Sequence, residues 1–290
     1  MGGAGLIITE ATAVQKKGRI THGCSGIWKD EQIIGHSRIA QFISRNGAIP
    51  GIQLGHAGRK ASMQRPWYGN GPLNEDDFER GDMPWNIVAP SACSVGEGWQ
   101  IPEEMSEEQI CELIDDFIAA ARRAISAGYK VIELHGAHGY LIHSFLSPVS
   151  NKRTDKYGGD LSGRMKLAID ISSALRRSIS DEMPLFFRVS STDNLENGWR
   201  LEDSVELAKE LKKVGVDVID CSSGGISGSA TAARGKRMPG YQVPFAEKIK
   251  HNANVMTMAV GLITHPEQAN QIIESGPVSY THLRAHETVV

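Results

Sequence analysis

The sequence predicts an α/β fold, and within that class an incomplete (β/α)8 TIM barrel with about six of the eight βα units present. Six short apolar segments alternate with helical segments, a pattern that both barrels and doubly wound sheets share. Two observations favour the barrel. Polar or small residues follow the apolar segments, where the carboxyl ends of barrel strands converge on one mouth. The long connections, residues 55–105, 136–163 and 222–243, all follow predicted strands.

The elements follow one another as strand and helix. The predicted strands are residues 6–9, 51–54, 131–134, 185–189, 216–219 and 255–260. The clearest helix begins at Ser106, which has capping-box spacing to Gln109 and precedes a stripe of apolar residues that reaches Ala121. Thr264 and Glu267 repeat the capping spacing, which predicts a second helix before residue 276.

The chain is predicted to hold one domain, the partial barrel of residues 1–276. A closed barrel needs eight strands, so we expect one strand to be missing before Met1 and another after Gly276. Residues 277–290, PVSYTHLRAHETVV, show neither clear period nor a further βα unit. We interpret them as a non-native tail, similar to translated adapter sequence, which adds no structural element.

Composition narrows the class of function. The net charge is −3 with both signs mixed along the chain, so no nucleic-acid or membrane-surface footprint is visible, and a small-molecule substrate is expected. The four cysteines, Cys24, Cys93, Cys111 and Cys221, lack CxxC spacing, which argues against zinc, iron–sulfur clusters and a disulfide framework. No apolar run approaches the roughly 20 residues that span a bilayer, and the N-terminus lacks a basic n-region. A cytoplasmic protein is expected.

The most informative segment is VIELHGAHGYLIHSFLSP, residues 131–148, an apolar strand that ends in histidines. Such a cluster can bind a metal, perform general acid–base chemistry, or cradle a polar ligand. A catalytic zinc normally has three protein ligands, and no carboxylate or third histidine has matching placement beside His135 and His138. Both imidazoles could also be hydrogen-bonded structural groups. We treat His143 as a structural or loop residue.

Five segments in order resemble the old yellow enzyme family of FMN-dependent ene-reductases, especially the bacterial branch of NADPH dehydrogenases and xenobiotic reductases. These are GLIITEATAV, GIQLGHAGRK, IELHGAHGYLIHSFLSPVSNKRTDKYGG, LFFRVSSTD and AVGLIT. The resemblance covers about residues 3–276. It implies a truncation at both ends, because the family's first strand and its phosphate-binding Gly-Arg pair have no counterpart here.

The resemblance implies that His135 and His138 hold a substrate carbonyl oxygen and stabilise the charge that develops on it. Gly136 and Ala137 lie between them and belong to the same substrate-binding segment. Tyr140 is expected to donate a proton to the substrate or to orient it, with loop packing as the alternative.

The same resemblance implies the flavin contacts. Gln53 offers an amide donor and acceptor to the pyrimidine half of the ring, unless it is merely a polar group at the edge of the core. Arg188 is expected beside the flavin, with an internal salt bridge as the rival interpretation. Ala11 lets the ring approach the backbone, and Gly261 completes the predicted cofactor-binding set.

The expected activity is therefore that of an FMN-dependent oxidoreductase that passes hydride from NAD(P)H to the β-carbon of α,β-unsaturated carbonyls or similar electrophiles. No GxGxxG follows a strand, so NAD(P)H is expected to visit the flavin pocket in a ping-pong cycle. Two alternatives stay open: a flavin-free, non-catalytic fragment, and the barrel of a larger dienoyl-CoA reductase or amine dehydrogenase relative. The resemblance also allows a homo-oligomer.

Overall fold

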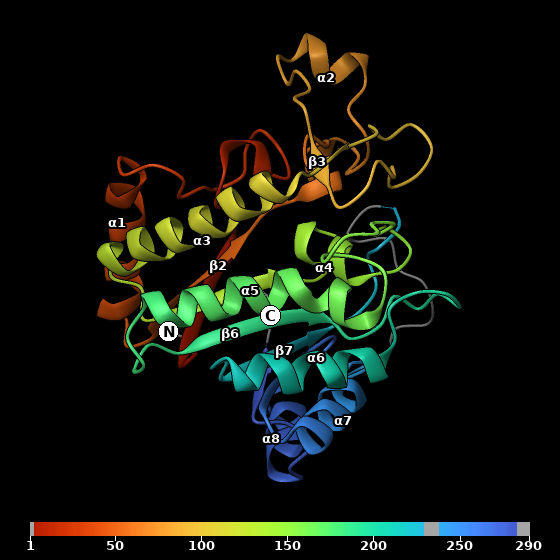
Figure 1. Ribbon diagram of the computed structural model, residues 1–290. Helices are drawn as coiled ribbons and strands as arrows, with labels where there is room; N and C mark the ends of the chain where they lie inside the picture. The colour runs from red at the N-terminus through yellow and green to blue at the C-terminus, as the bar shows by residue number, and fades with distance from the viewer. Residues whose placement is uncertain (1–2, 229–237, 283–290) are drawn as a thin grey trace.

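A single parallel sheet of seven strands forms the centre of the molecule, whose computed structural model describes residues 3–228 and 238–282 (Figure 1). The strand order in the sheet is β1-β2-β5-β6-β7-β8-β9, and every neighbouring pair is parallel. The strands are β1 Leu6–Ala13, β2 Ile49–Gly55, β5 Val131–Gly136, β6 Leu185–Ser190, β7 Val218–Ser222, β8 Met256–Val260 and β9 Tyr280–His282.

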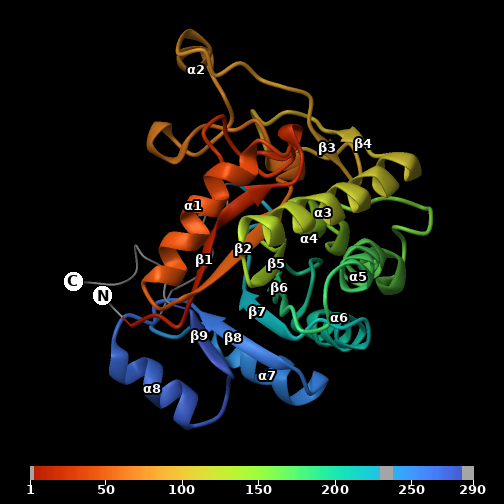
Figure 2. The same ribbon diagram turned by 90° about the vertical axis from the view of Figure 1, so that its left-hand side faces the viewer.

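Helices connect successive strands and cover one face of the sheet (Figure 2). They are α1 Gln32–Arg45, α3 Glu107–Ala127, α5 Leu161–Ser178, α6 Leu201–Lys213, α7 Val243–Ala253 and α8 Pro266–Glu274, with the short helices α2 Glu75–Glu79 and α4 Leu141–Leu146 in the loops. The 3-10 turns η1 Lys16–Gly18, η2 Gly58–Lys60 and η3 Pro66–Tyr68, and the small strands β3 Val88–Ala89 and β4 Glu103–Glu104, complete the described elements. The sheet curls with these helices outside, as a partial (β/α)8 barrel does.

The two faces of the curled sheet bury different side chains, because successive residues of a strand point to opposite sides. On β5, Ile132 and Leu134 belong to the large core under the helices. Val131 belongs to a separate apolar cluster on the inner face, formed by Val131, Phe186, Val218 and Met258 with Leu6 and Ile8. That cluster lies at the amino-terminal end of the strands and closes the bottom of the barrel interior.

The structure contains all six predicted strands and adds β9. Our prediction that residues 277–290 contribute no structural element is wrong for Tyr280–His282, which pair in parallel with β8. Val278 is buried in the main core, and the Ser279 N–H donates to the Thr257 carbonyl at 2.9 Å. The segment escaped detection because three residues are too few to show a period. The remainder of the predicted tail, residues 283–290, lies outside the described residues.

The structure confirms one of the two predicted helix N-caps and contradicts the other. Ser106 caps α3 as expected: its hydroxyl accepts the Gln109 N–H at 3.2 Å, and the side-chain oxygen Oε1 of Gln109 accepts the Ser106 N–H at 2.9 Å. Thr264 does not cap α8, whose N-cap is His265 with no side-chain cap bond. Pro266 explains the difference, because it fixes the first helical residue one position later than the capping spacing suggests.

The four cysteines are free thiols. Among the described residues, no helix combines the length and the apolar composition needed to cross a membrane.

Candidate active site

The sheet register brings the predicted site residues together from adjacent strands. Ala11 on β1 pairs with Gln53 on β2, and Gln53 pairs in turn with Glu133 on β5. Two residues further along β5, His135 pairs with Arg188 on β6. Residues that pair across a parallel ladder point to the same face, so these side chains rise together from the inner face of the barrel.

A buried polar layer lies above the apolar bottom of the barrel. Gln53 Nε2 donates to Glu133 Oε1 at 2.7 Å, and Arg188 Nε lies 3.2 Å from Asp220 Oδ2 on β7. All four side chains are buried. The structure therefore shows the internal salt bridge that was the rival interpretation of Arg188, and it shows Gln53 held by a carboxylate that sequence analysis did not single out.

The charges in this layer shift one another's pKa. Burial, reinforced by the negative charge of Asp220, raises the pKa of Glu133 to about 7. Burial alone would raise the pKa of Asp220, but the charge of Arg188 together with His282 and His135 outweighs burial, and the pKa of Asp220 is lowered. The layer thus holds one firmly ionised carboxylate and one carboxyl that titrates near neutrality.

Three rings meet at the carboxyl end of β5. The ring centroids of His135 and His138 are 5.2 Å apart, and that of Tyr140 is 4.9 Å from His135 and 6.5 Å from His138. Each pair is close to perpendicular, with interplanar angles of 90°, 85° and 89°. His135 and Tyr140 are buried and His138 is half-buried. The structure thus brings together all three residues that were predicted to be catalytic.

The backbone fixes the proton position on His135. Its Nδ1 accepts the Ala137 N–H at 3.3 Å, so the neutral ring carries its proton on Nε2, which is a hydrogen-bond donor. His138 Nε2 lies 2.6 Å from the Ser222 hydroxyl oxygen at the end of β7. When Nε2 accepts the hydroxyl proton of Ser222, Nδ1 is the nitrogen of His138 that carries the ring proton.

Close packing leaves no room for a larger side chain at Gly136, and Ala137 is fully buried. A Cβ on Gly136 would lie 2.4 Å from the Phe187 ring and 2.9 Å from the Arg188 carbonyl oxygen, so no side chain fits there. Ala137 is completely buried. Both residues therefore act through the backbone, by setting the turn that separates the two histidines.

A small hollow opens beside this cluster. It is lined by Ala11, Thr12 and Ala13 of β1, Gly55 of β2, His135 and Tyr140, together with Gly18, Arg19, Ile20, Cys24, His56 and Ala57. The small side chains of β1 leave room on one side of the hollow, and the imidazole and phenol face it from the other. His138 does not line the hollow itself and reaches it through its contact with His135.

The polar layer has groups that suit a flavin ring. An isoalloxazine needs donors and acceptors at its pyrimidine edge, and the buried side chains of Gln53 and Arg188 supply both kinds of group. Gln53 is also the residue of β2 that pairs with Ala11. Among the described residues, the buried oxygens Glu133 Oε2 and Asp220 Oδ1 have no hydrogen-bond partner, so the polar layer has unused acceptors. Gln53, Arg188 and Ala11 are the residues that would hold the ring, and Gln53 must share its amide with Glu133.

Gly261 lies apart from that group, just after β8. Its φ is +124°, and a Cβ there would lie 2.7 Å from the Tyr241 ring and 2.9 Å from Gln242 Nε2. Glycine is therefore required at this strand end by the backbone and by close packing. Gly261 is not one of the residues that line the hollow beside the three rings.

His143 is a structural group, as expected. Its Nδ1 accepts the Gly139 N–H at 2.8 Å, and its Nε2 lies 2.9 Å from Asp193 Oδ1, with both side chains completely buried. Asp193 also accepts from the Ser147 hydroxyl at 2.6 Å and from the Trp199 N–H at 2.7 Å. The pair fixes the loop that follows His138.

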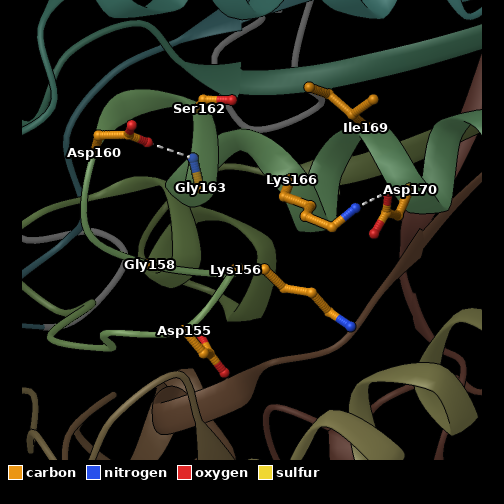
Figure 3. A pocket seen from close by; sticks show the side chains of 9 residues that line it. All are labelled: Asp155, Lys156, Gly158, Asp160, Ser162, Gly163, Lys166, Ile169 and Asp170. Carbon is orange, nitrogen blue, oxygen red and sulfur yellow. Dashed lines mark hydrogen bonds and ion pairs between the residues drawn. The ribbon is translucent and has the colours of Figure 1, made fainter.

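A second hollow is larger, but polar side chains that line it already have partners within the chain (Figure 3). It lies between the loop at Asp155 and the first turns of α5. Lys166 Nζ pairs with Asp170 at 3.1 Å, and the Asp160 carboxylate accepts the Gly163 N–H at 2.9 Å. The smaller hollow is the better candidate because it joins the ends of β1, β2 and β5.

Glu133, Asp220 and Ser222 are site residues that sequence analysis did not assign. One signal was present for Glu133: it alternates with Val131 and His135, so it shares their face of the strand. A carboxylate on the inner face of a buried strand needs a polar partner, which Gln53 provides.

Comparison with known proteins agrees with this geometry. The model of the NADH:flavin oxidoreductase / NADH oxidase family matches residues 1–280. The NADPH dehydrogenase of Halalkalibacterium halodurans is 45% identical over 274 residues, which cover 94% of this chain and 73% of that protein. The NADPH dehydrogenase of Listeria monocytogenes is 44% identical over 272 residues, with the same coverage of 94% and 73%.

Solved structures show the same fold. A 2-naphthoyl-CoA reductase superposes with a TM-score of 0.82 at 26% identity, over 97% of this chain. The chain spans only 42% of that reductase, so the reductase is the larger protein. Morphinone reductase superposes with a TM-score of 0.75 at 20% identity, over 96% of this chain and 73% of that enzyme.

Proposed function

The chain belongs to the NADH:flavin oxidoreductase / NADH oxidase family, whose members are FMN-dependent enzymes that take electrons from NAD(P)H, and we propose that it reduces the activated C=C bond of α,β-unsaturated carbonyl compounds. The observation that carries the proposal is the convergence of His135, His138 and Tyr140 beside the hollow at the ends of β1, β2 and β5.

The two histidines would bind the carbonyl oxygen of the substrate. When hydride reaches the β-carbon of an enone, negative charge develops on that oxygen. Imidazole N–H donors held in place before the reaction stabilise this charge more strongly than mobile water does. The Ala137 N–H occupies Nδ1 of His135, so Nε2 is the donor of that ring. If Nε2 of His138 accepts from the Ser222 hydroxyl, Nδ1 is the donor of the second ring. Bound FMN would supply the hydride that it receives from NAD(P)H.

Tyr140 would complete the reaction at the α-carbon. Its ring lies 4.9 Å from that of His135 and lines the same hollow. A phenol at this position can donate its proton to the α-carbon as the double bond is reduced. Because Tyr140 and the histidines lie on one short loop, all three groups can act on one small substrate.

Arg188 and Gln53 would hold the pyrimidine edge of the ring. Arg188 is paired with Asp220, and its guanidinium would still place a positive charge in the layer beneath the ring. A positive charge there would favour binding of an electron-rich cofactor. Gln53 is oriented by Glu133, so its amide presents a defined direction to a ligand. Ala11 would face the ring without a bulky side chain.

Turnover of cyclohex-2-enone tests this function. The full protein, supplied with FMN and NADPH, should form cyclohexanone with one NADPH consumed per molecule of product. Nitro compounds and nitrate esters serve as further acceptors in the same assay. Oxidation of NADPH by quinones or oxygen without any reduction of the enone would refute the assignment of enones as substrates.

A second candidate is the barrel of a larger reductase. The likeness to the 2-naphthoyl-CoA reductase, with a TM-score of 0.82, favours it. This function would place an acyl-CoA thioester carbonyl, instead of a free enone, between His135 and His138. A comparison of crotonyl-CoA with cyclohex-2-enone in the same assay distinguishes the two candidates by which substrate has the higher kcat/KM.

A further inference from the structure

Lys60 is a completely buried lysine that contacts residues 138–140, the segment after β5 that we call the histidine loop. It ends the turn η2, directly after β2. Its Nζ donates to the His138 carbonyl oxygen at 2.9 Å and to the Gly225 carbonyl oxygen in the loop after β7. One ammonium therefore joins the loops that follow β2, β5 and β7.

The three loops touch through their backbones, so the lysine has little freedom. A Cβ on Gly139 would lie 2.2 Å from the Gly225 carbonyl oxygen and 2.9 Å from Lys60 Cε. A Cβ on Gly58 would lie 2.8 Å from the Leu141 Cα. Glycine is required at both positions because the chains approach too closely for a side chain.

His138 has a backbone conformation that needs support. Its φ is +60°, which a residue with a Cβ rarely adopts and which costs free energy unless neighbouring groups hold it. The Ser190 hydroxyl oxygen accepts its N–H at 2.9 Å, and Lys60 binds its carbonyl oxygen. The peptide groups on both sides of the His138 Cα are therefore held by side chains from β6 and from the turn η2.

Burying the Lys60 ammonium to make these hydrogen bonds costs free energy of folding. Burial, reinforced by the charge of Arg59, lowers its pKa to about 7. Among the described residues, its hydrogen-bond partners are carbonyl oxygens and not carboxylates. Arg59 likewise donates to the carbonyl oxygens of Ile226 and Ser94. A buried cation that has no ionic partner within the described part of the chain opposes folding, so what it contributes is the geometry that it imposes.

We propose that Lys60 is a positioning residue for His138: by binding the His138 carbonyl oxygen and Gly225 together, it holds the imidazole in the orientation that receives the substrate carbonyl. Lys60 does not touch the substrate, and its effect is exerted through the backbone of the histidine loop. The proposal rests on the proposed function, because it assigns His138 to the substrate oxygen.

Substitution of Lys60 in the FMN-loaded protein tests the proposal. Lys60→Met keeps the length and removes the donors, and Lys60→Arg keeps a cation. Lys130→Met, at the exposed position just before β5, is the matched control. We expect Lys60→Met to lower kcat for cyclohex-2-enone by about tenfold or more, as misplacement of a reacting group does, with the Kd of FMN within about twofold. Lys60→Arg should recover part of the loss, and the control should match the wild type.

Hydrogen exchange supplies a readout that does not depend on activity. In Lys60→Met, the amides of residues 138–140 should exchange faster, while those of β5 and β6 stay protected. If Lys60→Met does not fold, Lys60→Gln, which keeps one donor, replaces it under the same limits. Wild-type kcat together with unchanged exchange at residues 138–140 would overturn the proposal, and so would a loss of FMN that parallels the loss of kcat. A wild-type protein that reduces no enone refutes the proposed function instead, and the exchange result still decides the role of Lys60.

Discussion

His135 and Arg188 occupy paired positions on the adjacent strands β5 and β6, so an imidazole donor and a guanidinium rise from the same face of the barrel. Under the proposed function, the group that binds the substrate oxygen and the cation beside the cofactor are thus direct neighbours. The pairing explains how one strand end can serve both ligands, and it makes the two roles separable by mutation.

Arg188→Ala should weaken FMN binding and lower the reduction potential of the bound flavin. The reason is the loss of a positive charge beside a ring that gains negative charge on reduction. For this two-electron couple, each 1.4 kcal/mol of lost stabilisation corresponds to about 30 mV. A redox titration of the loaded protein measures the shift.

The control for Arg188 must account for Asp220, which lies 3.2 Å from Arg188 Nε and would be left buried without its partner. Arg188→Ala combined with Asp220→Asn removes both charges. If the potential is equal to or higher than that of the wild type in both variants, Arg188 does not lie beside the flavin.

His138→Ala should cost about 2–4 kcal/mol of transition-state stabilisation in the reduction of cyclohex-2-enone, the range found when one donor to a developing oxyanion is removed. FMN should stay bound, because His138 contacts Ser222 and His135 and does not belong to the polar layer. His251→Ala, at an exposed position of α7, is the control. The measurement is kcat/KM beside the flavin content, and unchanged enone turnover would remove His138 from the mechanism.

The raised pKa of Glu133 should make the stability of the protein depend on pH. Burial and then Asp220 raise its pKa from 4.5 to about 7, so the folded state binds this proton more tightly than the unfolded state does. The contribution of Glu133 to the free energy of unfolding is therefore fully present below its unfolded pKa and is lost as the pH rises through 7.

Glu133→Gln lacks this titration. The free energy of unfolding of the wild type, minus that of Glu133→Gln, should fall between about pH 5 and about pH 8, by at most about 1.4 kcal/mol per pH unit. Denaturant unfolding at each pH measures both values. A difference that stays constant, or that rises with pH, would show that Glu133 is ionised throughout.

Residues 277–282 should stabilise the sheet. β9 pairs with β8, Val278 is buried, and Lys250 Nζ donates to the Gly276 and Val278 carbonyl oxygens at 2.9 and 3.2 Å. Residues 1–276 should therefore unfold at lower denaturant than residues 1–290, with burial of Val278 alone worth about 1.5–3 kcal/mol. Equal midpoints for the two chains would show that the pairing of β9 adds nothing.

The sequence was sufficient for the elements whose signal is local. Six strands followed from apolar runs, and the start of α3 followed from the reciprocal bonds of Ser106 and Gln109, which depend only on neighbours three residues apart. The parallel sheet then placed His135 and Arg188 at one end, because the carboxyl ends of parallel strands lie together.

Contacts between distant segments could not be predicted in the same way. Lys60 and Gly225 are 165 positions apart, and nothing in GHAGRK indicates that its lysine reaches the loop after β7. The partner of Gln53 was missed because Glu133 lies within an apolar predicted strand, and the sequence alone does not show that its side chain points to the same face as Gln53. β9 was missed because its three residues pair only where β8 already presents an edge.

The most direct test of the account is the absorbance of the FMN-loaded protein under anaerobic conditions. We predict that NADPH or NADH bleaches the flavin band, and that cyclohex-2-enone then restores it. The restoring step should slow by about tenfold or more in His138→Ala, while the spectrum before bleaching is unchanged. A protein that binds no FMN, or whose bleached flavin is not reoxidised by the enone, would contradict the assignment of this barrel end as an enone-reducing site.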